Sequence, residues 1–198
     1  MKFRAMLALA AAAMLSACGL NSVPTAEENA KAKWADVQAA YQRRADLIPN
    51  LTATVAGAAS SERQILTDVM NARARATSVQ VSAEQLSDPN AVHQYQQAQD
   101  ALGGTLSRLL VVSERYPELR SQEAFQTLMT QLEGTENRIT IAIRDYNESV
   151  RVYNTTIRTF PDSIGAKIFY NAQPMTPFQA RAGADVAPTV NFNFGNSN

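Results

Sequence analysis

The sequence has little of what most catalytic and metal sites need. It contains one cysteine, one histidine and one tryptophan in 198 residues. A lone cysteine excludes an intramolecular disulfide, and one histidine with one thiol offers too few ligands for a zinc site. Basic and acidic residues cancel at 18 each, so no strong field attracts nucleic acid and we expect no nucleic-acid partner.

Signs of enzymatic chemistry are equally scarce. No glycine-rich phosphate loop follows a strand pattern, and His93 has no partner at ligand spacing, which favours a surface histidine. Asp145 and Glu148 stand three apart on one helix pattern, where a solvated face is the stronger interpretation. We therefore predict no enzyme activity, no cofactor and no metal.

The apolar N-terminal run is too short for a permanent membrane span. It covers residues 5–17 after two cations, or about 20 Å of helix against a hydrocarbon layer of about 30 Å. This pattern is typical of a secretory signal peptide, residues 1–17. Leu15-Ser-Ala-Cys18 looks like a bacterial lipobox, which predicts acylation of Cys18 and attachment to the membrane through the N-terminal lipid.

The predicted destination is the cell envelope. Gly19 follows the cysteine where an aspartate would be the inner-membrane retention signal, which favours the outer membrane, facing the periplasm, in a Gram-negative source. Residues 18–26 are expected to form a lipidated leash, with Thr25 capping the first helix and Glu28 completing a capping box.

After the leash, apolar residues recur at a heptad spacing that is typical of helices packed lengthwise. The first helix is predicted to run to about Thr77, much longer than an ordinary globular helix. Pro49 lacks the N–H that would bond the Ala45 carbonyl, so we expect a kink there and not a chain reversal. The first seam contains Trp34, Val37, Tyr41, Ile48, Leu51, Val55, Val69 and Ala72.

The remaining elements follow from caps and breakers. Residues 77–90 are expected to be a connection, ended by an Asp88 N-cap and a first-turn Pro89. Tyr116-Pro117 should end the second helix, and Ser121 should cap the third. A short fourth helix is expected from Ile164 to about Tyr170, and residues 171–198 are predicted to be an extended or disordered tail. Within it, Val190, Phe192 and Phe194 alternate with asparagine in a strand-like pattern that could dock on the bundle or on a partner.

Several separated motifs resemble the LemA family over about residues 30–170. They are residues 41–51 (YQRRADLIPNL), Trp34, Val37, residues 114–119 (ERYPEL), Glu136-Asn137, the Tyr-Asn pairs at 146 and 153, and Phe160-Pro161. The resemblance implies an antiparallel helical bundle on the outer side of a bacterial membrane and little about activity. The resemblance also implies an N-terminal transmembrane helix, as in most of the family, and the lipobox of this sequence departs from that pattern.

The fold class predicted is all-α: an antiparallel, LemA-like four-helix bundle of three long helices plus a short fourth, over residues 27–170. Polar residues that interrupt or border its seams are the candidate site. They form either an internal network that fixes helix register or, with Arg43 and Arg44 open to solvent, a contact for a partner's carboxylate. The candidates are Arg43, Arg44, Asp46, Asn50, Glu62, Glu136 and Asn137.

Two functions from different classes fit this sequence. The first is a non-enzymatic, lipid-anchored scaffold or adaptor that binds another envelope protein, or itself, through apolar surface left uncovered on the first helix around Trp34, Val37 and Tyr41. The alternative is a small-molecule or ion sensor whose pocket is lined by the polar residues between the helices.

Overall fold

The computed structural model describes residues 2–59 and 61–179, with side chains from residue 21 onward. Within that range the chain forms six α-helices, one 3-10 helix and no strand, which confirms the all-α class. The elements are α1 (Lys2–Ala58), α2 (Arg63–Ser78), η1 (Ala83–Ser87), α3 (Pro89–Ser113), α4 (Pro117–Arg120), α5 (Glu123–Thr156) and α6 (Asp162–Ile168).

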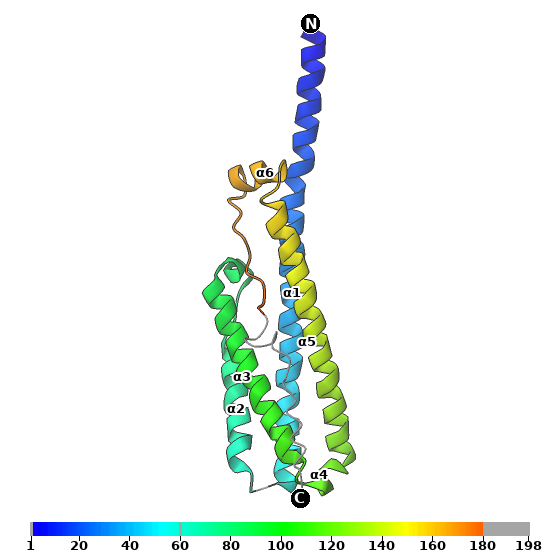
Figure 1. Ribbon diagram of the computed structural model, residues 1–198, viewed down its shortest axis with the longest axis vertical. Helices are drawn as coiled ribbons and strands as arrows, with labels where there is room; N and C mark the ends of the chain where they lie inside the picture. Colours follow the sequence, from blue (N-terminus) through cyan, green and yellow to red (C-terminus); the bar gives the residue numbers. More distant parts are fainter. Residues whose placement is uncertain (1, 60, 180–198) are drawn as a thin grey trace, which may run out of the picture.

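The helices pair lengthwise in an up-and-down arrangement. α1 runs the length of the molecule, α2 returns beside it, α3 descends, and α5 ascends after the short α4 (Figure 1). α1 packs along α5, and α2 packs along α3. Because α2 has 16 residues and α3 has 25, against 34 in α5, the second pair is too short to cover the whole seam of the first.

The prediction that the first helix runs to about Thr77 is wrong, because the chain reverses direction between Ala58 and Arg63. In place of three long helices and a short fourth, the described chain has four principal helices and two short ones. The heptad phase continues through this turn, with Glu62 midway between Val55 and Val69, so periodicity alone could not reveal it. Gly57 and the serines at 60 and 61 are weak helix formers that mark the place in the sequence.

Pro49 does not reverse the chain, as predicted, because α1 continues through it. The Ala45 carbonyl, which has no helical partner when proline stands four residues on, accepts a hydrogen bond from Nε of Arg73 at 2.7 Å. An arginine of α2 thus satisfies the polar group that the proline leaves free, which ties the two helices together at this level.

Of the three predicted helix caps, one is confirmed and two are wrong. The Asp88 cap of α3 is confirmed, since its carboxylate accepts from the Asn90 N–H at 2.9 Å. The other two are wrong: Thr25 lies inside α1, which continues through residues 19–26, where the leash was expected, and α5 begins at Glu123 after Gln122. Ser121 follows α4 instead, and its hydroxyl donates to the Glu118 carbonyl.

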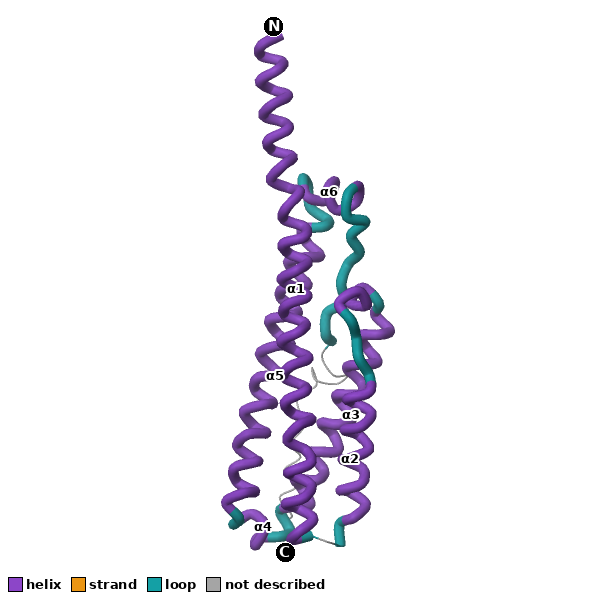
Figure 2. Tube along the Cα trace, turned by 180° about the vertical axis from the view of Figure 1, so that it is seen from behind, coloured by secondary structure: helices purple, strands orange, loops and turns teal. Residues whose placement is uncertain are grey.

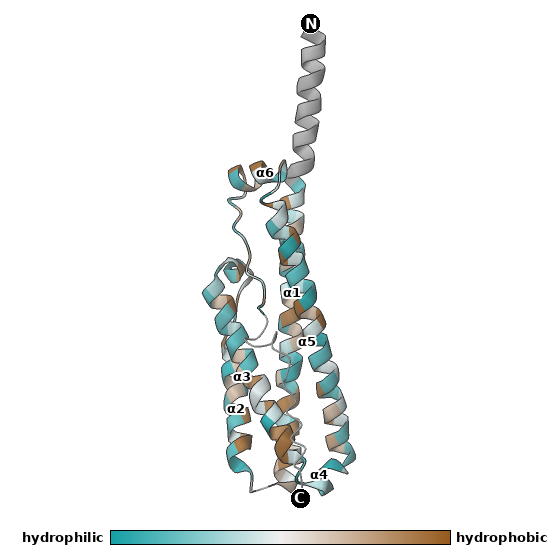
Figure 3. Ribbon diagram, in the orientation of Figure 1, coloured by the Kyte–Doolittle hydropathy of each residue, from teal (hydrophilic) through white to brown (hydrophobic). Residues whose placement is uncertain are grey.

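The core consists of two hydrophobic clusters stacked along the bundle axis. One surrounds Trp34, Tyr95 and Tyr146 near the upper half of α5, and the other surrounds Ile48, Leu102 and Leu132 near α4. Figure 3 shows hydrophobic and hydrophilic residues alternating along each long helix of the bundle, as expected for helices that bury one face. Each fully buried large side chain contributes about 1.5–3 kcal/mol before entropy is counted.

Residues 171–179, here called the docked segment, pack on the upper part of the α1–α5 seam beside the first turns of α3. The segment leaves α6 and runs back toward the N-terminal end of α3 (Figure 2). Asn171 turns the chain with a φ of 44°, a left-handed value that asparagine tolerates better than most residues. Met175 and Phe178 enter the core with 7% and 6% exposure.

The docked segment overturns one prediction about surface. Trp34, Val37 and Tyr41 were expected to be partly uncovered on α1, yet all three are buried. The Phe178 ring lies 5.7 Å from the ring of Trp34 and 6.4 Å from that of Tyr41, centroid to centroid. The tail is therefore extended and packed as far as Gln179; the alternating Val190, Phe192 and Phe194 lie outside the described residues.

Candidate functional site

A layer of polar side chains separates the two hydrophobic clusters. Arg44 of α1, Gln99 of α3 and Glu136 of α5 form this central polar layer. On each of these helices the residue stands between a residue of the upper cluster and one of the lower cluster, as Arg44 does between Tyr41 and Ile48. Two helices that run in one direction, α1 and α3, and one that runs in the other, α5, therefore present one polar position at the same level.

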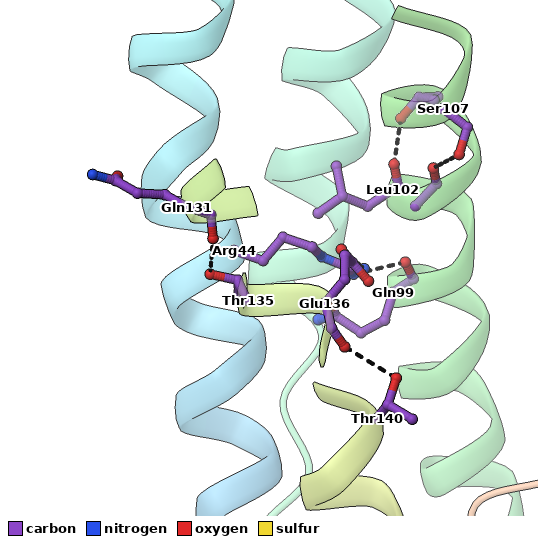
Figure 4. Close-up of polar contacts among 10 residues, drawn as sticks. Arg44, Gln99, Leu102, Ser107, Gln131, Thr135, Glu136 and Thr140 are labelled. Atoms are coloured by element: carbon purple, nitrogen blue, oxygen red, sulfur yellow. Dashed lines mark hydrogen bonds and ion pairs between the residues drawn. The ribbon is translucent and has the colours of Figure 1, made fainter. Parts of the chain in front are cut away.

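Arg44 is the centre of the layer and is 2% exposed. Its Nη2 donates to the backbone and side-chain oxygens of Gln99, both at 2.9 Å, and its Nη1 donates to Glu136 Oε1 at 3.3 Å (Figure 4). The guanidinium carbon lies 4.9 Å from the centre of the Tyr41 ring, within range of a cation–π contact. Gln99 in turn donates to the Ala76 carbonyl of α2 at 3.1 Å, so all four principal helices meet here.

One donor of Arg44 stays unused. Its Nε is buried and has no hydrogen-bond partner among the described residues. The Glu136 side chain is 48% exposed, so the ion pair is partly screened by solvent and contributes less than a fully buried pair. The two oxygens of Gln99 therefore provide most of the compensation for burying the charge.

The other predicted polar residues are not brought into this layer. Glu62 precedes α2 at the far end of the bundle, where it accepts from Arg115 Nη2 at 3.0 Å and from the Tyr116 hydroxyl at 3.1 Å. Asp46, which accepts from the Gln42 amide, and Asn50 and Asn137 lie on exposed faces. The side chain of Cys18 lies outside the described residues, so its acylation stays a prediction.

Arg43, the neighbour of Arg44, points away from the layer and lines a groove between α1 and α5. This outer groove has a volume of about 350 Å³. Its lining combines opposite charges with apolar surface: Asp36, Ala39, Ala40, Arg43, Arg138, Ile141, Ala142 and Asp145. Ile141 is 41% exposed, so an apolar side chain stands open among charged ones.

A second polar arrangement holds the docked segment to α5. Asn154 donates to the Met175 carbonyl at 2.9 Å and accepts from the Met175 N–H at 2.9 Å. Asn147 makes the same pair of bonds with Phe178, at 3.0 and 2.8 Å. Seven helical residues rise about 10.5 Å and three extended residues about 10 Å, so the two asparagines match the backbone they bind.

The tyrosines that precede these asparagines lie in the core and also help to hold the segment. Burial raises the pKa of Tyr146, which keeps its hydroxyl protonated, and this hydroxyl donates to the Thr176 carbonyl at 2.9 Å. The Thr176 N–H donates to the Leu86 carbonyl of η1 at 2.8 Å. Pro177 has no N–H, so every backbone N–H of residues 175–178 has a hydrogen-bond acceptor without a strand partner.

Sequence reasoning placed the Tyr-Asn pairs on the third helix seam but missed what the asparagines bind. The available signal was the spacing: two pairs seven residues apart, and two prolines three residues apart at 174 and 177 in a tail otherwise read as extended. Local propensity cannot connect these stretches, because the contact spans more than twenty residues.

The described part of the chain shows no cluster of three or more histidine, cysteine, aspartate or glutamate side chains able to hold a metal. His93 is half-buried on α3. Among the helices in the described range, none combines the length and apolar content needed to cross a membrane.

These features define a helical bundle with a polar layer in its core and a tail held by side chains. The sequence profile of the LemA family matches residues 33–192, and the chain belongs to that family. The chain is 27% identical over 157 residues to the magnetosome protein MamQ of Magnetospirillum gryphiswaldense, and 26% identical to the magnetosome proteins MamQ 1 and MamQ 2 of Paramagnetospirillum magneticum. Each match covers 71% of this chain and 58% of the relative's length.

Replacing Gln99 with leucine should destabilise the protein by about 2–4 kcal/mol, because the buried Arg44 loses an acceptor. Adding Arg44→Met should recover most of that loss, since no charge is then stranded. Urea unfolding of the single and double variants measures the coupling, with Gln97→Leu on the exposed face of α3 as control. Additive effects of the two substitutions would contradict the polar layer as described.

Replacing Asn147 with alanine removes two hydrogen bonds to the Phe178 backbone and should cost about 2 kcal/mol. The release of Phe178 from Trp34, the one tryptophan, should shift its fluorescence to longer wavelength. Asn137→Ala provides a matched control on the exposed face of the same helix. Equal, small effects of both substitutions would show that the asparagine does not hold the segment.

Proposed function

We propose that this protein is a non-enzymatic, lipid-anchored scaffold or adaptor of the cell envelope, held at the membrane by acylated Cys18. Support for the anchor comes from the Leu15-Ser-Ala-Cys18 sequence. α1 continues without a break from that region into the bundle, so an anchor at Cys18 would set the position of the whole bundle relative to the membrane. An outer-membrane location facing the periplasm belongs to the same proposal.

The outer groove is the observation that carries the adaptor part. The surface first expected to bind a partner is buried by α3 and the docked segment together, which leaves the opposite face of α1 available. There the groove offers Ile141 as an apolar contact and Arg43, Arg138, Asp36 and Asp145 as charged rim positions. An apolar centre with a polar rim is the usual composition of a protein interface.

The character of the relatives supports a structural role. They are named for the magnetosome, a cellular structure, and not for a reaction. Since the chain spans 58% of their length, any function shared with them is part of this proposal. The partner is another envelope protein or a second copy of this chain.

Site-specific photocrosslinking in intact cells tests the proposal. A photoreactive residue at Ile141 should give one discrete adduct, and Arg43→Glu should reduce that adduct severalfold by inverting charge at the rim. Val111, exposed on α3, is the control position. The absence of an adduct at Ile141, or the same adducts from both positions, would contradict the adaptor role.

The anchor is tested separately by fractionation. Cys18→Ser should move the protein from the membrane fraction to the soluble fraction, because the acyl chains provide the attachment. Native protein with an unmodified Cys18 would contradict the anchor and leave the groove to be judged by crosslinking.

A sensor of small polar molecules or ions is the second candidate. A pocket of about 260 Å³ lies between α1, α2 and α3 and is lined mostly by polar residues, among them Gln38, Gln42, Gln80 and Gln99. It borders the central polar layer, where Arg44 Nε has no partner among the described residues. Its volume is slightly below the usual lower limit for ligand sites, about 300 Å³. A thermal shift with small carboxylates or phosphate, lost in Gln99→Leu, would favour this function; no shift with either would exclude those ligands.

A further inference from the structure

The short helix α6 has the reverse of the usual polarity for a helix on the surface of a soluble protein. It turns its small residues, Gly165 and Ala166, toward the bundle, where both are buried. Its large apolar residues point outward, with Ile164 51% and Ile168 69% exposed. A surface helix normally buries such side chains and exposes the small or polar ones.

Apolar neighbours extend this face into one patch at the end of the bundle. Phe160 precedes α6 and is 81% exposed, and Phe169 and Tyr170 follow it with 66% and 41% exposure. The foot patch is defined as Phe160, Ile164, Ile168, Phe169 and Tyr170. Five large apolar side chains open to solvent in eleven consecutive residues exceed the isolated examples that are normal on a monomer.

The foot patch lies close to the predicted site of acylation, Cys18. α6 packs against α1 at the end of the bundle where α1 leaves it toward the N-terminus (Figure 1). The Ser22 hydroxyl donates to Asp162 Oδ1 at 2.7 Å. Ser22 lies four positions after Cys18 on the same helix, a rise of about 6 Å. Acyl chains on Cys18 would therefore begin beside α6.

We propose that the foot patch rests in the membrane interface, with its aromatic and aliphatic side chains among the lipid headgroups and upper acyl chains. This inference rests on the proposed attachment through Cys18. Interfacial helices bury their apolar face by about 5–10 Å, which is the depth available beside the anchor. Lys167 and Arg158, both exposed near the patch, are placed to meet lipid phosphates.

The foot patch gives the anchor a second contact. Acyl chains alone hold one point of the chain and leave the bundle free to tilt. Apolar side chains inserted beside them would fix its orientation, so that the outer groove keeps a constant height and direction above the membrane. The surface contacted is lipid, and not a second protein, because the patch lies at the end nearest the acyl chains. It also includes Tyr170, a residue type favoured at membrane interfaces, and phenylalanines, which are common on the apolar face of interfacial helices.

The test uses the acylated full chain in vesicles of phosphatidylethanolamine and phosphatidylglycerol. With Cys18 acylated, Ile168→Cys provides the one free thiol for an environment-sensitive fluorophore. Val111→Cys is the matched control, since Val111 is 66% exposed and lies near the C-terminus of α3, at the end of the bundle away from α6. The label at 168 should emit at shorter wavelength and be quenched severalfold more by nitroxide-bearing lipid than the label at 111.

Each outcome has one meaning. Protein that floats with the vesicles while its label at 168 stays as accessible to iodide as the label at 111 overturns the foot patch and leaves the anchor intact. A label shielded from iodide but not quenched by lipid nitroxide shows that protein covers the patch, which also overturns it. Acylated protein that fails to float contradicts the proposed anchoring and removes the basis of the foot patch with it.

Discussion

The α1–α5 pair presents a longer apolar seam than the α2–α3 pair can cover, and this mismatch in length organises the rest of the molecule. In the upper part of this seam, around Trp34 and Tyr146, Tyr95 of α3 provides part of the cover, and the remaining apolar surface would be costly to leave in water. A backbone segment without regular structure can enter such a core only if its polar groups find partners. Asn147 and Asn154 supply these partners to Phe178 and Met175. Side chains of a helix thus make the backbone hydrogen bonds that a neighbouring strand would make in a sheet.

The central polar layer separates a part of the core that is closed by helices alone from a part that the docked segment helps to close. Below the layer, α2 and α3 complete the core; above it, Met175 and Phe178 join Leu86 of η1 and Val92 and Tyr95 of α3. A buried arginine rarely adds stability compared with apolar residues of equal volume, but it opposes any shift in register that would separate it from Gln99. The layer therefore selects one alignment among helices whose heptad seams would otherwise tolerate sliding.

The sequence predicts the parts of this structure that depend on local signals. The heptad spacing indicates helices, Asp88-Pro89 marks the start of α3, and Arg44 and Glu136 stand out as seam positions with the wrong polarity. The reversal at 59–62 is hidden because the turn preserves the heptad phase across Glu62. The docked segment is hidden because residues 171–179 have no helical or strand pattern, and their conformation is set by contacts with Asn147 and Asn154. Phe178 of that segment contributes to the burial of Trp34 and Tyr41, and this contribution was missed with the segment.

For function, the consequence is that the face of α1 with the most apolar residues is buried inside the protein, and the outer groove and the foot patch are the surfaces that we propose for contact with other molecules. This division depends on the docked segment being part of the folded domain. Hydrogen exchange at the Met175, Thr176 and Phe178 amides of the full chain measures that most directly. The structure predicts protection close to that of amides in the middle of α5; exchange at the rate of an unstructured peptide would contradict it.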